Sequence, residues 1–484
     1  MSGRGTGQGG PPALQRELAV WLDGAPGRVG LLSARVAAGG AVSFVYDAAY
    51  LNHPQAVPLS VSLPLRTAAY ADAETRIFFD NLLPEGERRR AEALGRRIDP
   101  ADVVGLLEVL GRECPGAVSV VPSAAPPTKA PGHLDTDYEV LSEARIAALV
   151  EDAAAGRPTG ERARFSLAGV QQKLAVARDP ASGFFLLPRN GAPTTWLIKV
   201  EARQGEYHGI VANEALCLSV LRRLGLPAVH AERSVIGGIR VLLVARYDRI
   251  IGPGRLVSRR HQEDAAQVLG VPRELKYEAD AERAGVPAGS RGFSGLLGRF
   301  AGVLRSPGDA RVQLVEAAHA NWLLGNCDAH LKNFAVLHGM PEVGRLTAPG
   351  RLGFGFDLAP FYDVVCVGAY PDVDQTLAMH IGRAEQWDAV ERQDWLALAG
   401  QMFPGRRIGA GILARQLDWL KQAAAAALPA IDAAVGEGVA TREEAKPIRD
   451  VVGSRVRHLN RTLKWDIPAE TDAPIRRGGG WALS

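Results

Sequence analysis

Residues 325–334, GNCDAHLKNF, hold four side chains that could do chemistry together. Within six positions the segment presents Asp328, His330, Lys332 and Asn333, directly after the apolar run VQLVEAAHANWLL. Transfer of a phosphoryl group needs little covalent help from a protein and depends mainly on positioning and on neutralising charge. An Asp and an Asn at this spacing suit that reaction, because the carboxylate can face the acceptor hydroxyl while the amide oxygen binds magnesium.

The spacing is also that of the catalytic loop of protein kinases. Taken alone it is a weak signal, since Asp328 could cap a helix and Asn333 could lie in a turn. His330 could likewise be a loop histidine with a backbone partner. The hypothesis therefore depends on whether the other parts of a phosphoryl-transfer site are present.

Those parts follow one another in a consistent order. Lys199 ends the short apolar strand expected in TTWLIKVEA, and Glu214 lies on the next expected helix, where it could orient the lysine as an ion pair. Asp363, in FYDVV, could be a second magnesium ligand, with Asp357 as its rival. Gly169, in SLAGVQQK, could belong to a loop over the phosphates. Each residue has an ordinary alternative, such as a solvated strand end for Lys199, but a single hypothesis explains their order.

A metal-dependent hydrolase is the alternative for the same region. Cys327, Asp328, His330 and His338 offer mixed ligands, but their spacing fits no closed zinc pattern and no HExxH occurs. The Walker phosphate-loop pattern is also absent.

The surrounding patterns predict the elements that would hold these residues. Residues 18–50 alternate apolar and polar side chains in short runs, which favours an antiparallel sheet. Strands are expected in 194–202 and 239–250, with a helix in 209–225 between them. Helical periodicity then dominates, at 262–270, 292–305, 311–324, 388–401, 409–435 and 441–464. A small sheet with one helix before a large helical region is typical of an α+β, bilobal, protein-kinase-like fold.

Composition shifts divide the chain into six expected parts. These are a flexible tail at 1–17, a β-rich N-terminal subdomain at 18–123, a Pro-rich linker at 124–134, a kinase N-lobe with the phosphate loop and the lysine at 135–248, a helical C-lobe with the catalytic loop at 249–466, and a disordered tail at 467–484.

Composition excludes several other classes of protein. The 484 residues carry a net charge of +3, which is too balanced to require nucleic acid. No run of eighteen apolar residues occurs and the N-terminus lacks the apolar segment of a signal peptide, so we expect no membrane span. The four cysteines are far apart and form no CxxC pair, which fits a reducing cytoplasm.

The quoted motifs together resemble the HipA serine/threonine-protein kinase toxins. The segments that carry the resemblance are FSLAGVQQKLAV, WLIKV, VARYDR, HQEDAAQVLGVPRELKYEAD, NWLLGNCDAHLKNFAV and LAPFYDVV. The N-terminal segments PLSVSLPL, FFDNLLPEGERRR and GRECPGAVSV are similar to the amino-terminal subdomain of the same family. The resemblance runs from about residue 18 to about residue 465.

The resemblance implies a role for each site residue, with ATP and Mg²⁺ as cofactors. Asp328 would take the proton of the acceptor hydroxyl, and Asn333 and Asp363 would hold magnesium. Around ATP the family implies the phosphate loop Ala168, Gly169, Val170, Gln171, Gln172 and Lys173, the phosphate contacts Lys199, His330 and Lys332, the hinge Ala245, Arg246 and Tyr247, and Gln262.

Ser166 matches the serine on which family members autophosphorylate. A phosphate there would add about −2 charge to the phosphate loop and compete with ATP, which would switch the kinase off. The alternative for Ser166 is a turn-forming hydroxyl.

Two departures from the family pattern stand out. Better-known members often carry an acidic hinge residue where this chain has Ala245, so adenine affinity should fall if that contact uses the side chain. The segment between Asn333 and Asp363 is long, and its Gly and Pro content predicts a hairpin insert.

The resemblance implies a toxin kinase of a toxin–antitoxin pair that phosphorylates a translation-related protein, such as an aminoacyl-tRNA synthetase. Its expected partner is a separate HipB-like antitoxin of the helix-turn-helix class, and DNA would be reached only through that complex. The alternative is a weak or inactive family member that acts mainly as an antitoxin-binding co-repressor. A small-molecule kinase on the same scaffold is less favoured, because the extra N-terminal subdomain suits a protein partner.

Overall fold

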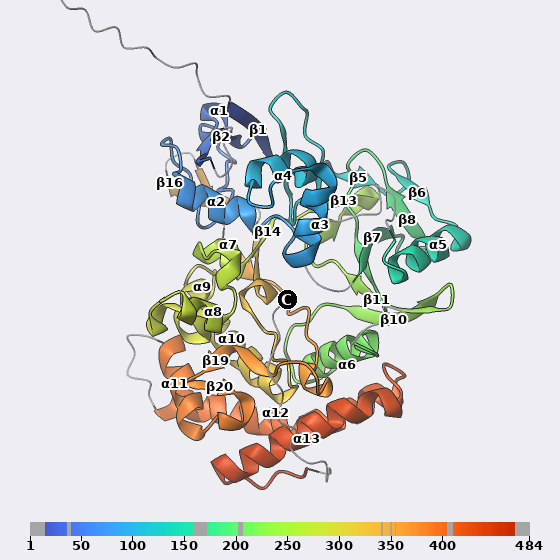
Figure 1. Cartoon of the computed structure of the whole chain (residues 1–484), viewed down its shortest axis with the longest axis vertical. Coiled ribbons are helices and arrows are strands. Elements are labelled where there is room, and N and C mark those ends of the chain that lie inside the picture. The colour runs from blue at the N-terminus through green and yellow to red at the C-terminus, as the bar shows by residue number, and fades with distance from the viewer. Residues whose placement is uncertain are drawn as a thin grey trace, which may run out of the picture.

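The computed structural model describes residues 15–35, 40–157, 172–201, 207–339, 342–348, 351–353, 355–403 and 410–469. Figure 1 shows three parts in chain order: an N-terminal domain, a second sheet beside it, and a mostly helical region at the opposite end. The α+β, kinase-like fold expected from the sequence is confirmed. The boundaries expected between the parts stay predictions.

The N-terminal domain is built on a four-stranded antiparallel sheet in the order β3-β2-β1-β4. Its strands are β1 (Gln15–Leu22), β2 (Gly30–Arg35), β3 (Val42–Tyr46) and β4 (Val118–Pro122), and its helices are α1 (Ala48–Leu51), α2 (Asp72–Asp80), α3 (Gly86–Arg96) and α4 (Val103–Leu110). A core of its own, including Leu32, Phe44 and Phe78, fills the space between them. β1 pairs with β2 from Gln15 onward, so residues 15–17, expected within the flexible tail, belong to a strand.

The second sheet has six strands in the order β10-β11-β9-β7-β8-β6. They are β6 (Tyr138–Val140), β7 (Lys173–Arg178), β8 (Phe185–Pro188), β9 (Trp196–Val200), β10 (Ala231–Ile236) and β11 (Ile239–Ala245), accompanied by α5 (Glu143–Ala154) and α6 (Ile210–Arg223). The strands expected in 194–202 and 239–250 are β9 and β11, and the helix expected between them is α6. Lys199 is the fourth residue of β9, opposite Lys173 of β7.

The helical region contains the largest core. Its helices are α7 (Ala265–Leu269), α8 (Glu278–Arg283), α9 (Gly298–Gly302), α10 (Pro307–Leu323), α11 (Arg392–Met402), α12 (Ala410–Gly436) and α13 (Arg442–Leu463). Short strands lie between them: β14 (Gln262–Asp264), β15 (Ala335–His338), β18 (Phe356–Leu358), β19 (Thr376–Ile381) and β20 (Ala384–Gln386). The end of α10 leads directly to the segment of Asp328 and Asn333.

The structure differs from the sequence patterns at the start of α7 and agrees with them at the hairpin that follows β15. The helix expected at 262–270 begins only at Ala265, because Gln262–Asp264 pairs with β15 as a strand. The expected hairpin insert is confirmed as β16 (Glu342–Ala348) and β17 (Arg351–Gly353). Ile467, the first residue of the tail expected to be disordered, is buried, and its N–H donates to Asn460 Oδ1 at 3.0 Å.

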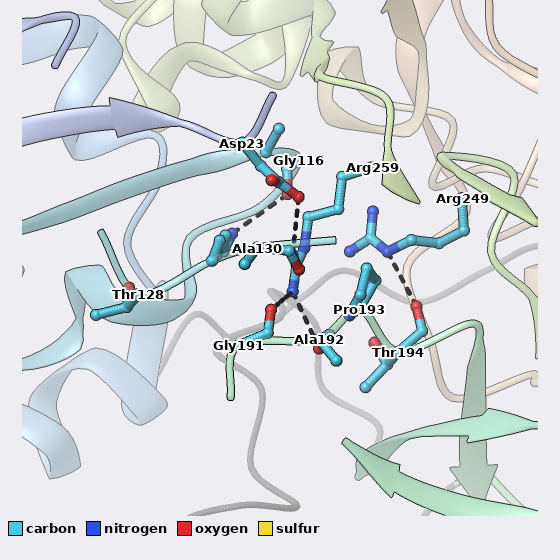
Figure 2. A network of polar contacts seen from close by, with 12 residues as sticks. Asp23, Gly116, Thr128, Ala130, Gly191, Ala192, Pro193, Thr194, Arg249 and Arg259 are labelled. Carbon is cyan, nitrogen blue, oxygen red and sulfur yellow. Dashed lines mark hydrogen bonds and ion pairs between the residues drawn. The ribbon is translucent and has the colours of Figure 1, made fainter. Parts of the chain in front are cut away.

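The segment between the first two domains is fixed by buried cations. Lys129 is 5% exposed and donates to three backbone carbonyl oxygens between Cys114 and Val118. Figure 2 shows Arg259, of β13 (Leu256–Arg259), donating to Asp23 at 3.0 Å and to the Gly191 carbonyl at 3.0 Å. β13 also pairs with β12 (Arg249–Ile251) and β5 (Gly132–His133). The N-terminal domain is therefore tied to the rest by charged contacts with little access to water.

Among the described helices, none combines the length and apolar character needed to cross a membrane.

His319 of α10 makes the stability of the helical core sensitive to acid. It is 1% exposed and lies against Trp395 and Trp419, at 4.8 and 5.9 Å between ring centroids. Burial lowers the pKa of His319 to about 3, so between about pH 6.5 and 3 the unfolded chain binds a proton that the folded chain does not. As pH falls through that window, this histidine should lower the unfolding free energy of wild type by up to about 1.4 kcal/mol per pH unit. We expect His319→Phe to lack this contribution.

Urea denaturation of wild type and variant at several pH values measures this difference. His208→Phe, at an exposed position, is the control and should leave the slope unchanged. An equal pH dependence in wild type and His319→Phe would contradict the prediction.

Candidate active site

A buried lysine joins the second sheet to the helical region. Lys199 Nζ lies 2.5 Å from Glu214 Oε1 and 2.6 Å from Asp363 Oδ1. The side chains of Lys199 and Glu214 are 5% and 1% exposed, whereas that of Asp363 is 38% exposed. The ion pair between Lys199 and Glu214 expected from the sequence is therefore present, and Asp363 completes it from the side open to solvent.

The charges in this group depend on one another. The Lys199 ammonium holds the pKa of Asp363 far below its usual value, although burial opposes this shift. Burial alone would lower the pKa of Lys199, but the charges of Asp363 and Glu214 raise it. For Glu214, burial raises the pKa and Lys199 counteracts only part of that shift. Asp363 therefore stays ionised, as a cation ligand must.

Asp363 has a backbone conformation that side-chain-bearing residues rarely adopt. Its φ is +58°, in the left-handed region. Such conformations are costly and persist where the surroundings fix them, often at functional sites. Its rival Asp357 lies elsewhere, paired with Arg260 at 2.9 Å and Arg305 at 3.4 Å. The geometry favours Asp363 as the carboxylate beside Lys199.

Hydrogen bonds hold the loop that carries Asp328 and Asn333. The Asn333 amide nitrogen donates to the Asp328 carbonyl oxygen at 2.8 Å. Asn326 Oδ1 accepts from the Asp328 N–H at 3.2 Å. Tyr277, at the start of α8, donates its hydroxyl to Asp328 Oδ1 at 2.9 Å. The loop thus orients the Asp328 carboxylate and leaves the amide oxygen of Asn333 as its available ligand atom.

His330 and Lys332 have different surroundings from one another. The His330 ring is buried against the edge of Tyr277, with ring centroids 5.1 Å apart, and burial lowers its pKa. Lys332, expected by the phosphates, instead donates from Nζ to Asp264 Oδ2 at 2.7 Å and to Asn81 Oδ1 at 2.8 Å. The Lys332 ammonium therefore faces the N-terminal domain.

The expected hinge is where β11 ends. The Ala245 N–H donates to the His230 carbonyl at 2.9 Å. The Arg246 guanidinium forms a buried ion pair with the Asp248 carboxylate, at 3.0 Å. Tyr247 stacks on Tyr362, with ring centroids 5.6 Å apart.

The side-chain oxygen of Gln262 accepts a hydrogen bond from the Tyr247 hydroxyl. The structure thus brings Tyr247 and Gln262 together, as expected around a nucleotide. The side chain of Arg246 lies away from them, in a structural ion pair.

Four residues of the expected phosphate loop, Ala168, Gly169, Val170 and Gln171, lie outside the described residues, as does the expected autophosphorylation site Ser166. Gln172 is exposed, and Lys173 begins β7 opposite Lys199. Burial lowers the pKa of Lys173, while the charge of Asp363 raises it in part. Lys173 and Lys199 thus lie opposite one another on the two central strands of the sheet, and Lys199 contacts Asp363.

The hydrolase alternative finds no support among the described residues. His338 lies with His261 and Glu263, and no group of three potential ligands there includes Cys327, Asp328 or His330. Glu263 in turn accepts hydrogen bonds from Ser60 and from the Val61 N–H, so this cluster joins the domains.

The side-chain donors present fit magnesium and a nucleoside triphosphate. Magnesium prefers carboxylate and amide oxygens together with phosphate oxygens, and Asp363 and Asn333 supply both kinds. Lys199 and Lys173 supply positive charge beside Asp363. Sequence reasoning missed Tyr277, although KYEAD was among the motifs, and it missed Asn81 and Glu85, which contact the loop from the N-terminal domain. Asn81 and Glu85 lie about 250 positions before Lys332, the loop residue that they contact, so these contacts leave no local signal.

Comparisons with known proteins agree with this arrangement. Residues 165–431 match the model of the HipA-like C-terminal domain and residues 18–121 that of the HipA N-terminal domain. The Sinorhizobium fredii protein Y4mE, provisionally named a kinase, is 32% identical over 76% of this chain and 82% of its own length. The serine/threonine-protein kinase toxin HipA of Shewanella oneidensis is 29% identical over 67% of this chain and 70% of its own.

A solved structure of Shewanella oneidensis HipA, in a complex with HipB and operator DNA, has the same fold. Its TM-score is 0.71 at 23% identity, covering 93% of this chain and 98% of that one. The fold and the site therefore define a protein of the kinase-like class. Within that class, the chain belongs to the HipA family.

Lys199 should be essential to stability because Glu214 is buried. Removing one partner of a buried ion pair costs about 3–5 kcal/mol, whereas replacing both partners by apolar groups is often nearly neutral. We expect Lys199→Met to lower the unfolding free energy by about that amount, and Lys199→Met with Glu214→Leu to recover most of it.

Urea denaturation checks this prediction. Arg240→Met is the matched control, because Arg240 pairs with Glu201 but its side chain is 51% exposed, and such pairs contribute about 0–1 kcal/mol. A double variant as unstable as Lys199→Met would contradict the assigned pairing.

Proposed function

We propose that this protein is an ATP- and Mg²⁺-dependent serine/threonine-protein kinase of the HipA type. The observation that carries the proposal is Lys199 held between buried Glu214 and half-exposed Asp363. A lysine paired with a helix glutamate and placed beside a metal-binding aspartate is the arrangement that protein kinases need for activity. Membership of the HipA family supports the same reaction.

Each residue of the site would have a separate role in phosphoryl transfer. Asp328, oriented by the Tyr277 hydroxyl, would accept the proton of the substrate hydroxyl. Asn333 and Asp363 would hold Mg²⁺, which when bound neutralises charge on the phosphates. Lys199 and Lys173 would position the phosphates, and Tyr247 and Gln262 would border the adenine. His330, neutral because its pKa is lowered by burial, would face the phosphates without adding charge.

We further propose that the kinase is the toxin of a toxin–antitoxin pair. The fold neighbour forms a complex with HipB and operator DNA, which supports a HipB-like, helix-turn-helix antitoxin as partner and contact with DNA through that complex. The substrate would be a translation-related protein, such as an aminoacyl-tRNA synthetase, and the site of action the cytoplasm. Self-inactivation would occur at Ser166, whose assignment rests on its motif.

Phosphoryl transfer is tested by the mass of the intact protein after incubation with ATP and Mg²⁺. Wild type should gain one phosphate, and Asp328→Ala should gain none because its proton acceptor is missing, while its melting temperature stays close to wild type. Asp357→Asn is the control at a nearby acid outside the site and should gain phosphate.

A phosphate gain in Asp328→Ala equal to that of wild type would contradict the assignment. If protein purified without phosphate gains none in wild type or in either variant, and still binds the antitoxin, the result would favour the co-repressor function instead.

The switch is tested by peptide mapping of the phosphorylated protein. Phosphate should lie on Ser166, and Ser166→Ala should stay active toward an added protein substrate after preincubation with ATP, when wild type has lost activity. Ser182→Ala, in an exposed turn, should behave as wild type. Phosphate on another residue, with none on Ser166, would refute the switch.

A further inference from the structure

A short segment of the N-terminal domain lies against the residues around Asp328 and Asn333. Residues 80–85, called here the α2–α3 junction, connect the end of α2 to the start of α3. Asp80 pairs with Arg273 at 2.7 Å, and the Asn81 amide nitrogen donates to the Val271 carbonyl at 3.2 Å. The junction therefore lies against residues 271–276, which directly precede Tyr277.

Glu85 makes the closest approach to the catalytic loop. Its carboxylate lies 2.7 Å from Lys276 Nζ and 3.5 Å from Lys332 Nζ, and its side chain is 18% exposed. Burial would raise the pKa of Glu85, but Lys332 and Lys276 together lower it. Glu85 is thus a partly buried carboxylate that holds two lysines from two separate segments.

Both lysines adjoin groups that act on the reacting atoms. Lys276 precedes Tyr277, whose hydroxyl donates to Asp328. The Lys276 carbonyl oxygen accepts a hydrogen bond from the Leu331 N–H at 3.3 Å. Lys332 precedes Asn333.

The Lys332 carbonyl also accepts the Tyr362 hydroxyl at 2.8 Å, and Tyr362 precedes Asp363. The contacts of the junction therefore lead through Lys276 to Tyr277, whose hydroxyl bonds Asp328, and through Lys332 to Asn333 and to the residue before Asp363.

We propose that the α2–α3 junction of the N-terminal domain positions the catalytic loop, with Glu85 acting through Lys276 and Tyr277 on Asp328 and through Lys332 on Asn333. Glu85 and Tyr277 are positioning residues in this account. The inference rests on the proposed kinase function. It explains why the Lys332 ammonium, at the centre of the catalytic motif, is directed to Asn81 and Asp264, and it makes the N-terminal domain part of the catalytic machinery.

The test compares Glu85→Gln, Tyr277→Phe and their combination with wild type. A displaced loop should lower kcat roughly ten- to a hundredfold. In Tyr277→Phe, KM for ATP should change little, because this variant acts on Asp328 and leaves Lys199, Asn333 and the hinge untouched. Because both residues act on the same carboxylate, the double variant should lose little more than the worse single variant. Glu87→Gln, in the same turn of α3 but with a side chain 78% exposed, is the control and should keep wild-type kcat.

Hydrogen exchange of the amides of residues 328–334 provides a readout that does not need activity. Glu85→Gln should exchange faster there than wild type, and Glu87→Gln should not. Wild-type kcat in both Glu85→Gln and Tyr277→Phe, or unchanged exchange in Glu85→Gln, would overturn the inference.

If wild type transfers no phosphate, the proposed function fails and the exchange data alone decide the inference. If Glu85→Gln fails to fold, Tyr277→Phe, which removes a single hydroxyl, still tests it by the ratio of kcat to KM.

Discussion

The ion-paired amine of Lys199 is the interaction on which the active site depends. It lies on β9, a central strand of the second sheet, opposite Lys173 of β7. Its partners come from α6 and from the helical region. Since Glu214 is almost fully buried, the lysine must stay in place for that carboxylate to be tolerated. Asp363, the exposed member, is thereby kept ionised where a cation and phosphates can reach it. One amine thus joins the sheet, the helix α6 and the segment of Asp363, the proposed metal ligand.

The contacts of the N-terminal domain follow the same physical pattern. Arg259 with Asp23, Glu263 with Ser60, and Lys332 with Asn81 all join it to the rest of the chain through charged groups with little exposure. Buried charged contacts of this kind are costly unless their geometry is satisfied, so they favour one arrangement over slightly displaced ones. The domain therefore has a defined position against the loop of Asp328 and Asn333. A domain attached only by an apolar patch would have more freedom to shift.

The sequence was informative where chemistry and spacing are local. The five-residue interval from Asp328 to Asn333, the strand of Lys199 and the helix of Glu214 could be predicted because periodicity and motif order are visible along the chain. The strand Gln262–Asp264 was mistaken for helix because its partner, β15, lies some seventy positions away. The orientation of Lys332 could not be foreseen for the same reason, since Asn81 is 251 positions distant. Arg246 was expected at the adenine, but its buried pairing with Asp248 depends on how β11 ends.

The central claim is that Lys199, Glu214 and Asp363 form a magnesium–nucleotide site, and calorimetric titration with ATP tests it most directly. Wild type and Asp363→Asn would be titrated with ATP in the presence and absence of Mg²⁺. The account predicts that Mg²⁺ strengthens ATP binding to wild type and that this gain is lost in Asp363→Asn. Binding to wild type that is indifferent to Mg²⁺, or an undiminished Mg²⁺ effect in Asp363→Asn, would contradict it.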